Sequence, residues 1–148
     1  MRSVSALVPH PGGKMEPMTA TLTSTGSTAA VIVTHQRAEL LRASLEQVVH
    51  QTHPVQWVIV VDNGAENAVR ELVESMAGDR GVYVPSETNL GGAGGFALGF
   101  LTALSLGADA VWCADDDGRP ADNTVLAELY RVAEANRLHC LLYTSPSP

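Results

Sequence analysis

The sequence predicts an α/β protein, a Rossmann-like parallel sheet flanked by helices. Four short apolar runs alternate with segments in which apolar residues recur at helical spacing. The runs lack the polar alternation of half-exposed strands, which is typical of strands buried on both faces of a parallel sheet. Polar or glycine-rich motifs follow these runs, and ligands on such sheets bind beyond the carboxyl ends of the strands.

The predicted elements follow from these two periodicities in chain order. Strands are expected at residues 29–34, 58–61, 82–84 and 110–114. Helices are expected around residues 40–49, 69–76, 96–104 and 125–133, with Gly78 and Gly107 at the ends of the second and third. Cys113 lies inside the last apolar run and is expected to be a small buried hydrophobe.

Composition divides the chain into three segments. Residues 1–28 are rich in Pro, Gly, Ser and Thr without periodicity, so they are expected to be a disordered N-terminal extension. Residues 29–138 carry all the predicted strands and helices. Residues 139–148 change composition abruptly and resemble translated sequencing-adapter read-through, so we expect an unstructured, artefactual tail.

Charge and hydropathy exclude some classes of protein. The 148 residues include 9 basic and 16 acidic side chains, for a net charge of −7, which argues against a nucleic-acid-binding module. No stretch approaches the roughly 20 apolar residues of a membrane span. We therefore expect a cytoplasmic protein and leave open a peripheral association with the inner face of the plasma membrane.

Three consecutive carboxylates, Asp115, Asp116 and Asp117, follow the last apolar run directly. Continued strand geometry would place Asp115 and Asp117 on one side and Asp116 on the other. Carboxylates this close repel each other unless they are protonated or bridged by a cation. Mn²⁺ or Mg²⁺ is the natural bridge, because hard divalent ions take oxygen ligands and share them with substrate phosphates. The sequence therefore predicts a metal–diphosphate site.

Shorter motifs end the first two strands. The donor fork of Arg37 suits a phosphate or a base edge, although on its own an exposed arginine at a helix start explains it better. Asp62-Asn63-Gly64 is good turn chemistry, and Asp62 at the ligand edge can equally accept the imide N–H of a uracil. Taken alone, this motif leaves both interpretations open.

A glycine-rich run, Asn89 to Phe96, follows the third strand and precedes a helix. Its glycines are Gly91, Gly92, Gly94 and Gly95. They permit positive φ and close approach of a ligand, and the N-terminus of the following helix favours anions. The density of glycine favours a phosphate or sugar cradle over a flexible turn.

These motifs, in this order, resemble the nucleotide-sugar-binding half of a family 2 glycosyltransferase with a GT-A fold. The resemblance covers residues 29–138 and rests on Thr34–Arg37, Asp62-Asn63, Asn89–Phe96 and Asp115–Asp117. Within the family, the last two motifs are most similar to those of galactofuranosyltransferases of arabinogalactan synthesis, the initiating type above all. His35 and Gln36 stand where Tyr and Asn are more frequent.

The resemblance implies a role for each matching position. Thr34 and Arg37 would line the nucleotide pocket, and Asp62 would hold the uracil. The other implied substrate-binding residues are Asn89, Gly91, Gly92, Gly94, Gly95 and Asp116. Asp115 and Asp117 would hold Mn²⁺ or Mg²⁺ against the diphosphate of a UDP-sugar donor.

The family implies inverting, metal-dependent transfer of a sugar to a polyprenyl-linked glycan acceptor. UDP-galactofuranose is the expected donor, and dTDP-rhamnose is the alternative, because thymine and uracil would pair alike with Asp62. In the family the catalytic base lies in the following acceptor-binding half, so none is assigned within residues 1–148. We expect an N-terminal fragment that binds UDP weakly without turnover.

Two other classes of function remain open at this stage. A non-catalytic nucleotide-binding module is expected if the protein ends at Pro148. A phosphatase would use Asp115 as nucleophile and Asp117 as acid, although no Thr or Lys partner lies nearby in the sequence. Nucleotide preference separates them, because a phosphatase should show no preference for a nucleoside diphosphate.

Overall fold

The centre of the molecule is a four-stranded parallel sheet. The computed structural model describes residues 7–9, 15–17 and 26–138. The strands are β3 (Thr28–Thr34), β4 (Trp57–Asp62), β5 (Gly81–Pro85) and β6 (Ala110–Asp115), in the order β5-β4-β3-β6. Each neighbouring pair is parallel. The Rossmann-like sheet and its four predicted strands are therefore confirmed.

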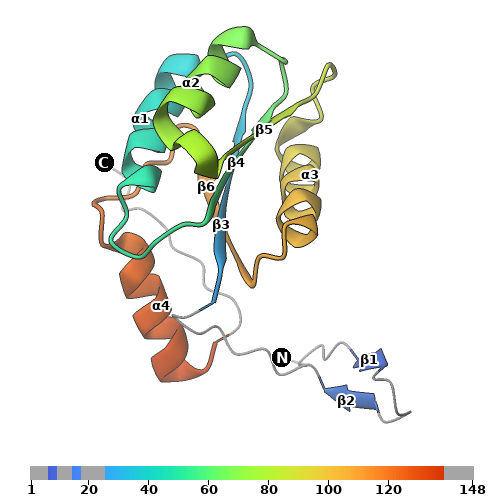
Figure 1. The fold of residues 1–148 in the computed structure, drawn as a ribbon, viewed down its shortest axis with the longest axis vertical. Helices are drawn as coiled ribbons and strands as arrows, with labels where there is room; N and C mark the ends of the chain where they lie inside the picture. Colours follow the sequence, from blue (N-terminus) through green and yellow to red (C-terminus); the bar gives the residue numbers. More distant parts are fainter. Residues whose placement is uncertain (1–6, 10–14, 18–25, 139–148) are drawn as a thin grey trace.

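Helices α1 (Ala38–Val49), α2 (Asn67–Ala77) and α3 (Gly91–Ser105) connect the strands, α4 (Val125–Asn136) follows β6, and together the helices cover both faces of the sheet. A 3-10 turn, η1 (Gly78–Arg80), follows α2. Figure 1 shows α1 and α2 side by side on one face and α3 on the opposite face. Leu126 and Tyr130 place α4 on the α1–α2 side, because they belong to the same core cluster as Leu41 and Leu45 of α1.

The two faces of the sheet carry separate hydrophobic cores. Ile32 and Val60 face α1, α2 and α4, whereas Val31 and Val33 face α3. All seven residues of β3 are buried, because the strand is central and helices cover both of its sides. This explains the unbroken apolar run from which the strand was predicted.

Strand β6 departs from its prediction. Among the described strands it pairs with β3 alone, so it lies at an edge of the sheet. Its residues are half-buried or exposed apart from Ala114, and Cys113 is exposed. The expectation that Cys113 is buried was wrong, because an apolar run identifies a strand but not its position within the sheet.

Helix α3 begins earlier than predicted. It starts at Gly91 rather than near Phe96, so the glycine-rich segment expected as a loop forms the first turns of the helix. The helix lies close against β3, since a Cβ added to Gly95 would come within 2.5 Å of Val33 Cγ1. A Cβ on Gly99 would collide with Val31 in the same way. Glycine at these two positions permits the close helix–strand approach.

The N-terminal segment contains some regular structure. Two short strands, β1 (Leu7–Pro9) and β2 (Met15–Pro17), pair antiparallel inside the segment predicted to be disordered. The rest of residues 1–25 and the predicted tail, residues 139–148, lie outside the described residues. No helix in the described part of the chain has the length and apolar character required to cross a membrane.

Candidate functional site

The carboxyl ends of the strands bring the predicted motifs to one edge of the sheet. In the parallel register, Thr34 of β3 lies opposite Asp62 of β4, and Val33 lies opposite Asp115 of β6. Asp62 in turn lies opposite Pro85 of β5. Residues far apart in the sequence therefore meet where ligands bind to sheets of this kind.

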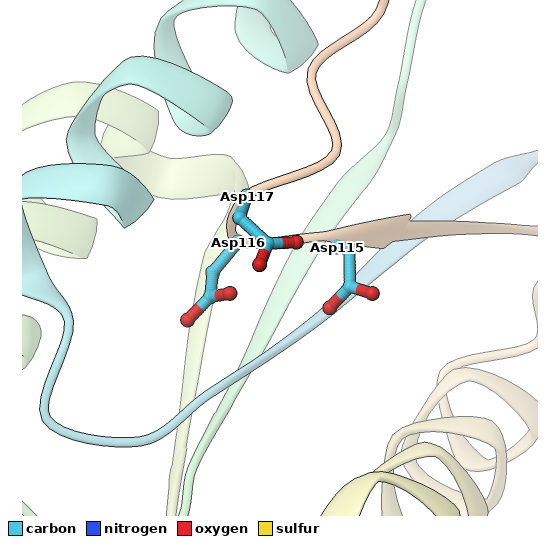
Figure 2. Close-up of side chains that lie close together, drawn as sticks. All are labelled: Asp115, Asp116 and Asp117. Carbon is cyan, nitrogen blue, oxygen red and sulfur yellow. The ribbon is translucent and has the colours of Figure 1, made fainter. Parts of the chain in front are cut away.

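The aspartate cluster, Asp115, Asp116 and Asp117, is compact. Carboxylate oxygens of the three residues lie within 4.8 Å of one another. Figure 2 shows the three side chains projecting to the same side of the backbone as it leaves β6. The strand ends at Asp115, so strict alternation does not continue and Asp116 joins its neighbours rather than facing away. Asp116 is buried, whereas Asp115 and Asp117 are exposed.

Electrostatics in the cluster favour a cation. Partial burial, followed by the negative charges of Asp117 and Asp116, raises the pKa of Asp115 above its usual value. Three carboxylates form a hard oxygen donor set, which suits Mg²⁺ or Mn²⁺. The donor set present in the aspartate cluster therefore fits a divalent ion.

Residues at the end of β3 hold the buried member of the cluster. The hydroxyl of Thr34, itself buried, donates a hydrogen bond of 2.9 Å to Asp116 Oδ2. Arg37 Nη1 lies 3.4 Å from Asp116 Oδ1 and 3.2 Å from Asp117 Oδ2. Thr34 therefore contacts the aspartate cluster from the protein interior, while the half-exposed Arg37 contacts it from the solvent side.

The turns after β3 and β4 carry backbone strain. Gln36 has φ 56° and Ala65 has φ 50°, in the left-handed region that residues with a Cβ seldom adopt. His35 Nδ1 lies 3.1 Å from the carbonyl oxygen of Asn63 and so links the two turns. Strained residues persist where the surrounding structure holds them, and they cluster at ligand sites.

Asp62 is fully buried and surrounded by donors from its own chain. Its carboxylate accepts hydrogen bonds from the N–H groups of Gly64 at 2.9 Å and Glu66 at 2.6 Å. The Tyr83 hydroxyl donates a third, of 2.9 Å. Burial, helped by this bond and by the charge of Asp62, raises the pKa of Tyr83 to about 12. Contact between Asp62 and a uracil would require this turn to move.

Asn63 attaches the N-terminus of α3 to β4. Its Oδ1 accepts a hydrogen bond from Leu90 N–H, and its Nδ2 donates one to the carbonyl of Gly91, each of 3.3 Å. The side chain of Asn89 accepts a bond of 2.8 Å from Gly91 N–H. These contacts hold the first turn of the glycine-rich helix at the same sheet edge as Asp62.

The predicted residues therefore form two groups at one edge. Thr34, Arg37 and the aspartate cluster touch one another directly. The second group joins Asp62, Asn89 and the glycine segment through Asn63. Gly91 and Gly92 are exposed there, Gly94 is half-buried, and Gly95 is buried against β3.

Sequence reasoning missed two supporting residues. Ser44 of α1 is fully buried and donates a hydrogen bond of 2.9 Å to the carbonyl of Asp115, which fixes the start of the aspartate turn. A polar residue on the apolar face of the predicted helix was the available signal. Tyr83, which contacts Asp62, lay inside an apolar run and gave no separate signal.

The parallel sheet and its flanking helices have the arrangement of part of the GT-A fold of glycosyltransferases. Two solved glycosyltransferases have similar structures, each with 20% sequence identity. The mannosyltransferase PcManGT from Pyrobaculum calidifontis, in complex with GDP-Man and Mn²⁺, matches 71% of this chain and 32% of its own, with a TM-score of 0.60. TarS of S. aureus matches 74% and 20%, with a TM-score of 0.57.

Residues 29–147 match glycosyl transferase family 2, so the chain belongs to that family. It is 52% identical over 125 residues to galactofuranosyltransferase GlfT1 of Mycolicibacterium smegmatis, covering 84% of this chain and 40% of the relative. Identity to GlfT1 of Mycobacterium tuberculosis H37Rv is 51% over 112 residues, covering 74% and 36%. The chain thus spans about two fifths of the length of these relatives.

Proposed function

We propose that the chain is the donor-binding part of a galactofuranosyltransferase that uses UDP-galactofuranose. The aspartate cluster at the carboxyl end of β6 carries the proposal, because it offers compact oxygen ligands beside the nucleotide edge of the sheet. Identity of 52% to a galactofuranosyltransferase supports the choice of sugar over the alternative donor, dTDP-rhamnose. The parent activity would be an inverting transfer.

In this proposal the aspartates hold the metal and the diphosphate. Asp115 and Asp117 are the proposed ligands of Mn²⁺ or Mg²⁺, since their carboxylates are exposed. When bound, the cation offsets negative charge that develops on the leaving UDP. Thr34 keeps the Asp116 carboxylate in place through its buried hydrogen bond.

The nucleotide sugar is proposed to lie over the second group of residues. Gly91 and Gly92 leave room for close approach, and nothing within 4 Å would meet a side chain at either position. Helix α3 begins at this edge, and a helix N-terminus favours negative charge such as that of the donor. Asn89 and Asn63 hold that turn in position.

The acceptor and the chemistry at its hydroxyl belong to the whole protein. We place the catalytic base in the part of the relatives that this chain does not span, so the chain alone is expected to bind UDP without turnover. A polyprenyl-linked glycan is the proposed acceptor. The proposed location is the cytoplasm, with peripheral association at the inner face of the plasma membrane.

Calorimetric titration with UDP, in the presence and absence of Mn²⁺, tests the proposal. We expect Mn²⁺ to be required and UDP to be preferred over nucleoside diphosphates with purine bases. Asp115→Asn and Asp117→Asn should each weaken UDP binding in Mn²⁺ by at least about tenfold, which corresponds to roughly 1.4 kcal/mol.

Asp79→Asn is the matched control, because it removes the same charge from η1, outside the carboxyl edge of the sheet. It should leave UDP affinity unchanged. Equal affinity in the two cluster variants and the wild type would refute the metal assignment. Failure of every folded variant, wild type included, to bind UDP would refute the donor-binding function itself.

A further inference from the structure

Arg37 occupies a position between the end of β3 and the aspartate cluster. It is the residue that immediately precedes α1, and the left-handed turn at Gln36 directs the chain there. A single nitrogen, Nη1, lies 3.4 Å from Asp116 Oδ1 and 3.2 Å from Asp117 Oδ2. The guanidinium thus pairs with one proposed metal ligand, Asp117, and with the buried carboxylate of Asp116 beside it.

Of the three side chains in this contact, only that of Asp116 is buried. The side chain of Asp116 is 5% exposed, whereas those of Arg37 and Asp117 are 53% and 57% exposed. A buried carboxylate needs a compensating charge or donor, while a half-exposed arginine gives up a contact at little cost. Arg37 can therefore leave the aspartate cluster once another cation takes its place.

The rest of the guanidinium is available for a ligand. Nη2 and Nε make no hydrogen bond to any residue of the described chain, and arginine offers five N–H donors in a planar fork. That fork matches the oxygens of a phosphate. The side chain stands beside the proposed diphosphate position with most of its donors unused.

We propose that Arg37 is an exchangeable counter-ion of the aspartate cluster. It neutralises Asp116 and Asp117 while no metal is bound. When a divalent ion binds Asp115 and Asp117, the ion supplies the positive charge beside Asp116, and Arg37 moves to the diphosphate of the nucleotide. This inference rests on the proposed function. It adds that Arg37 competes with the metal for the carboxylates and then binds the diphosphate of the nucleotide.

The exchange couples the two ligands. Metal binding alone must displace Arg37, so the metal binds weakly to the free protein. A nucleoside diphosphate gives the displaced guanidinium a new partner, so metal and nucleotide each strengthen binding of the other by the same factor. The carboxylates would thereby attract a metal mainly when the donor is present.

Mn²⁺ titrations of the full chain, with and without UDP, test the exchange in Arg37→Gln. We expect Arg37→Gln to bind Mn²⁺ alone about three- to tenfold more tightly than wild type. Each of the two ion pairs that the half-exposed Arg37 makes is expected to weaken Mn²⁺ binding by about a few-fold, and the substitution removes both. UDP binding at saturating Mn²⁺ should weaken by about tenfold. Without metal, Arg37→Gln should melt earlier than wild type, and Mn²⁺ should raise its midpoint by more.

Arg42→Gln is the matched control, because Arg42 lies exposed on α1 and makes no ion pair with the described residues. It should bind Mn²⁺ and UDP as wild type does. Arg37→Lys keeps the charge without the fork, so it should retain weak Mn²⁺ binding and lose part of the UDP affinity. This variant also serves if Arg37→Gln does not fold.

The outcomes separate the inference from the proposed function. If wild type binds Mn²⁺ and UDP but Arg37→Gln binds Mn²⁺ equally or more weakly, the counter-ion role is wrong and the donor site stands. If neither folded protein binds Mn²⁺ at any UDP concentration, the metal site and the inference both fail. Tighter Mn²⁺ binding in Arg37→Gln together with weaker UDP binding supports the exchange.

Discussion

At the scale of single residues, the buried carboxylate of Asp116 shows how the site is held together. Burying a charge is costly unless hydrogen bonds and an opposite charge compensate it. Thr34 supplies a buried hydroxyl at 2.9 Å, and Arg37 supplies the charge at 3.4 Å. Asp116 is therefore held between its two exposed neighbours, and the geometry of the cluster depends on two residues outside it, Thr34 and Arg37.

Thr34→Val removes the hydroxyl while keeping the shape of the side chain. We expect the free energy of unfolding to fall by about 1–3 kcal/mol, because a buried carboxylate loses a hydrogen bond. Urea denaturation at constant m-value measures the change. Thr88→Val, at an exposed loop position, is the control and should stay within about 0.5 kcal/mol of wild type. An equal effect of both substitutions would contradict this role of Thr34.

At the scale of elements, the glycines of α3 decide how closely the helix lies on β3. Gly95 and Gly99 are one helical turn apart and both face the central strand. Their lack of a Cβ permits contact with Val33 and Val31 that larger residues would prevent. The same close packing places the N-terminus of α3 beside Asn63, where the donor is proposed to bind.

Two alanine substitutions in α3 should therefore differ in their effect on stability. Gly99→Ala should lower the free energy of unfolding by about 1–3 kcal/mol through overpacking against Val31, despite the better helix propensity of alanine. Gly92→Ala, where a Cβ meets nothing within 4 Å, should leave stability unchanged or raise it by up to about 1 kcal/mol. Thermal and urea denaturation test the pair, and similar losses in both would contradict the packing argument.

At the scale of the whole molecule, contacts between distant segments close the end of the sheet opposite the site. Ser27, just before β3, donates hydrogen bonds of 2.8 Å from its N–H and from its hydroxyl to Asp109 Oδ2, just before β6. The N–H of Asp109 returns a bond of 2.9 Å to the carbonyl of Ser27. These residues are 82 positions apart, so the contact joins the first and last strands of the described sheet.

This contact predicts a pH-dependent part of the stability. The hydrogen bonds from the backbone and then the side chain of Ser27 lower the pKa of Asp109. A carboxylate with a lowered pKa in the folded state stabilises above its unfolded pKa of about 3.9, and that stability is lost as pH falls through the folded pKa.

We therefore expect wild type to melt above Asp109→Asn at pH 6 and the difference to shrink as pH falls toward 3. Thermal denaturation across this range measures the difference between the two proteins. Asp79→Asn is the control for general loss of charge and should show no such convergence. A difference between wild type and Asp109→Asn that is constant with pH would rule out a contribution from the charge of Asp109.

Much of the fold was predictable because apolar periodicity reports local geometry directly. The four strands and four helices lie where the spacing of apolar residues predicted them. The start of α3 was missed, since glycine has low helix propensity and only packing against β3 explains a helix there. The exposure of Cys113 was missed because neighbouring strands, not the run itself, determine what is buried.

For the site, the sequence alone determined which residue types stand at the carboxyl ends of the strands, because chain direction and strand ends are local properties. It identified the aspartate cluster and the glycine segment on that basis, whereas the role expected for Arg37 came from the family resemblance. Only the tertiary structure decided that Thr34 and Arg37 hold Asp116, and that Tyr83 holds Asp62. Such pairings join strands and helices that are distant in the sequence, so they exist only once the sheet has assembled and the core has excluded water from Asp116 and Asp62.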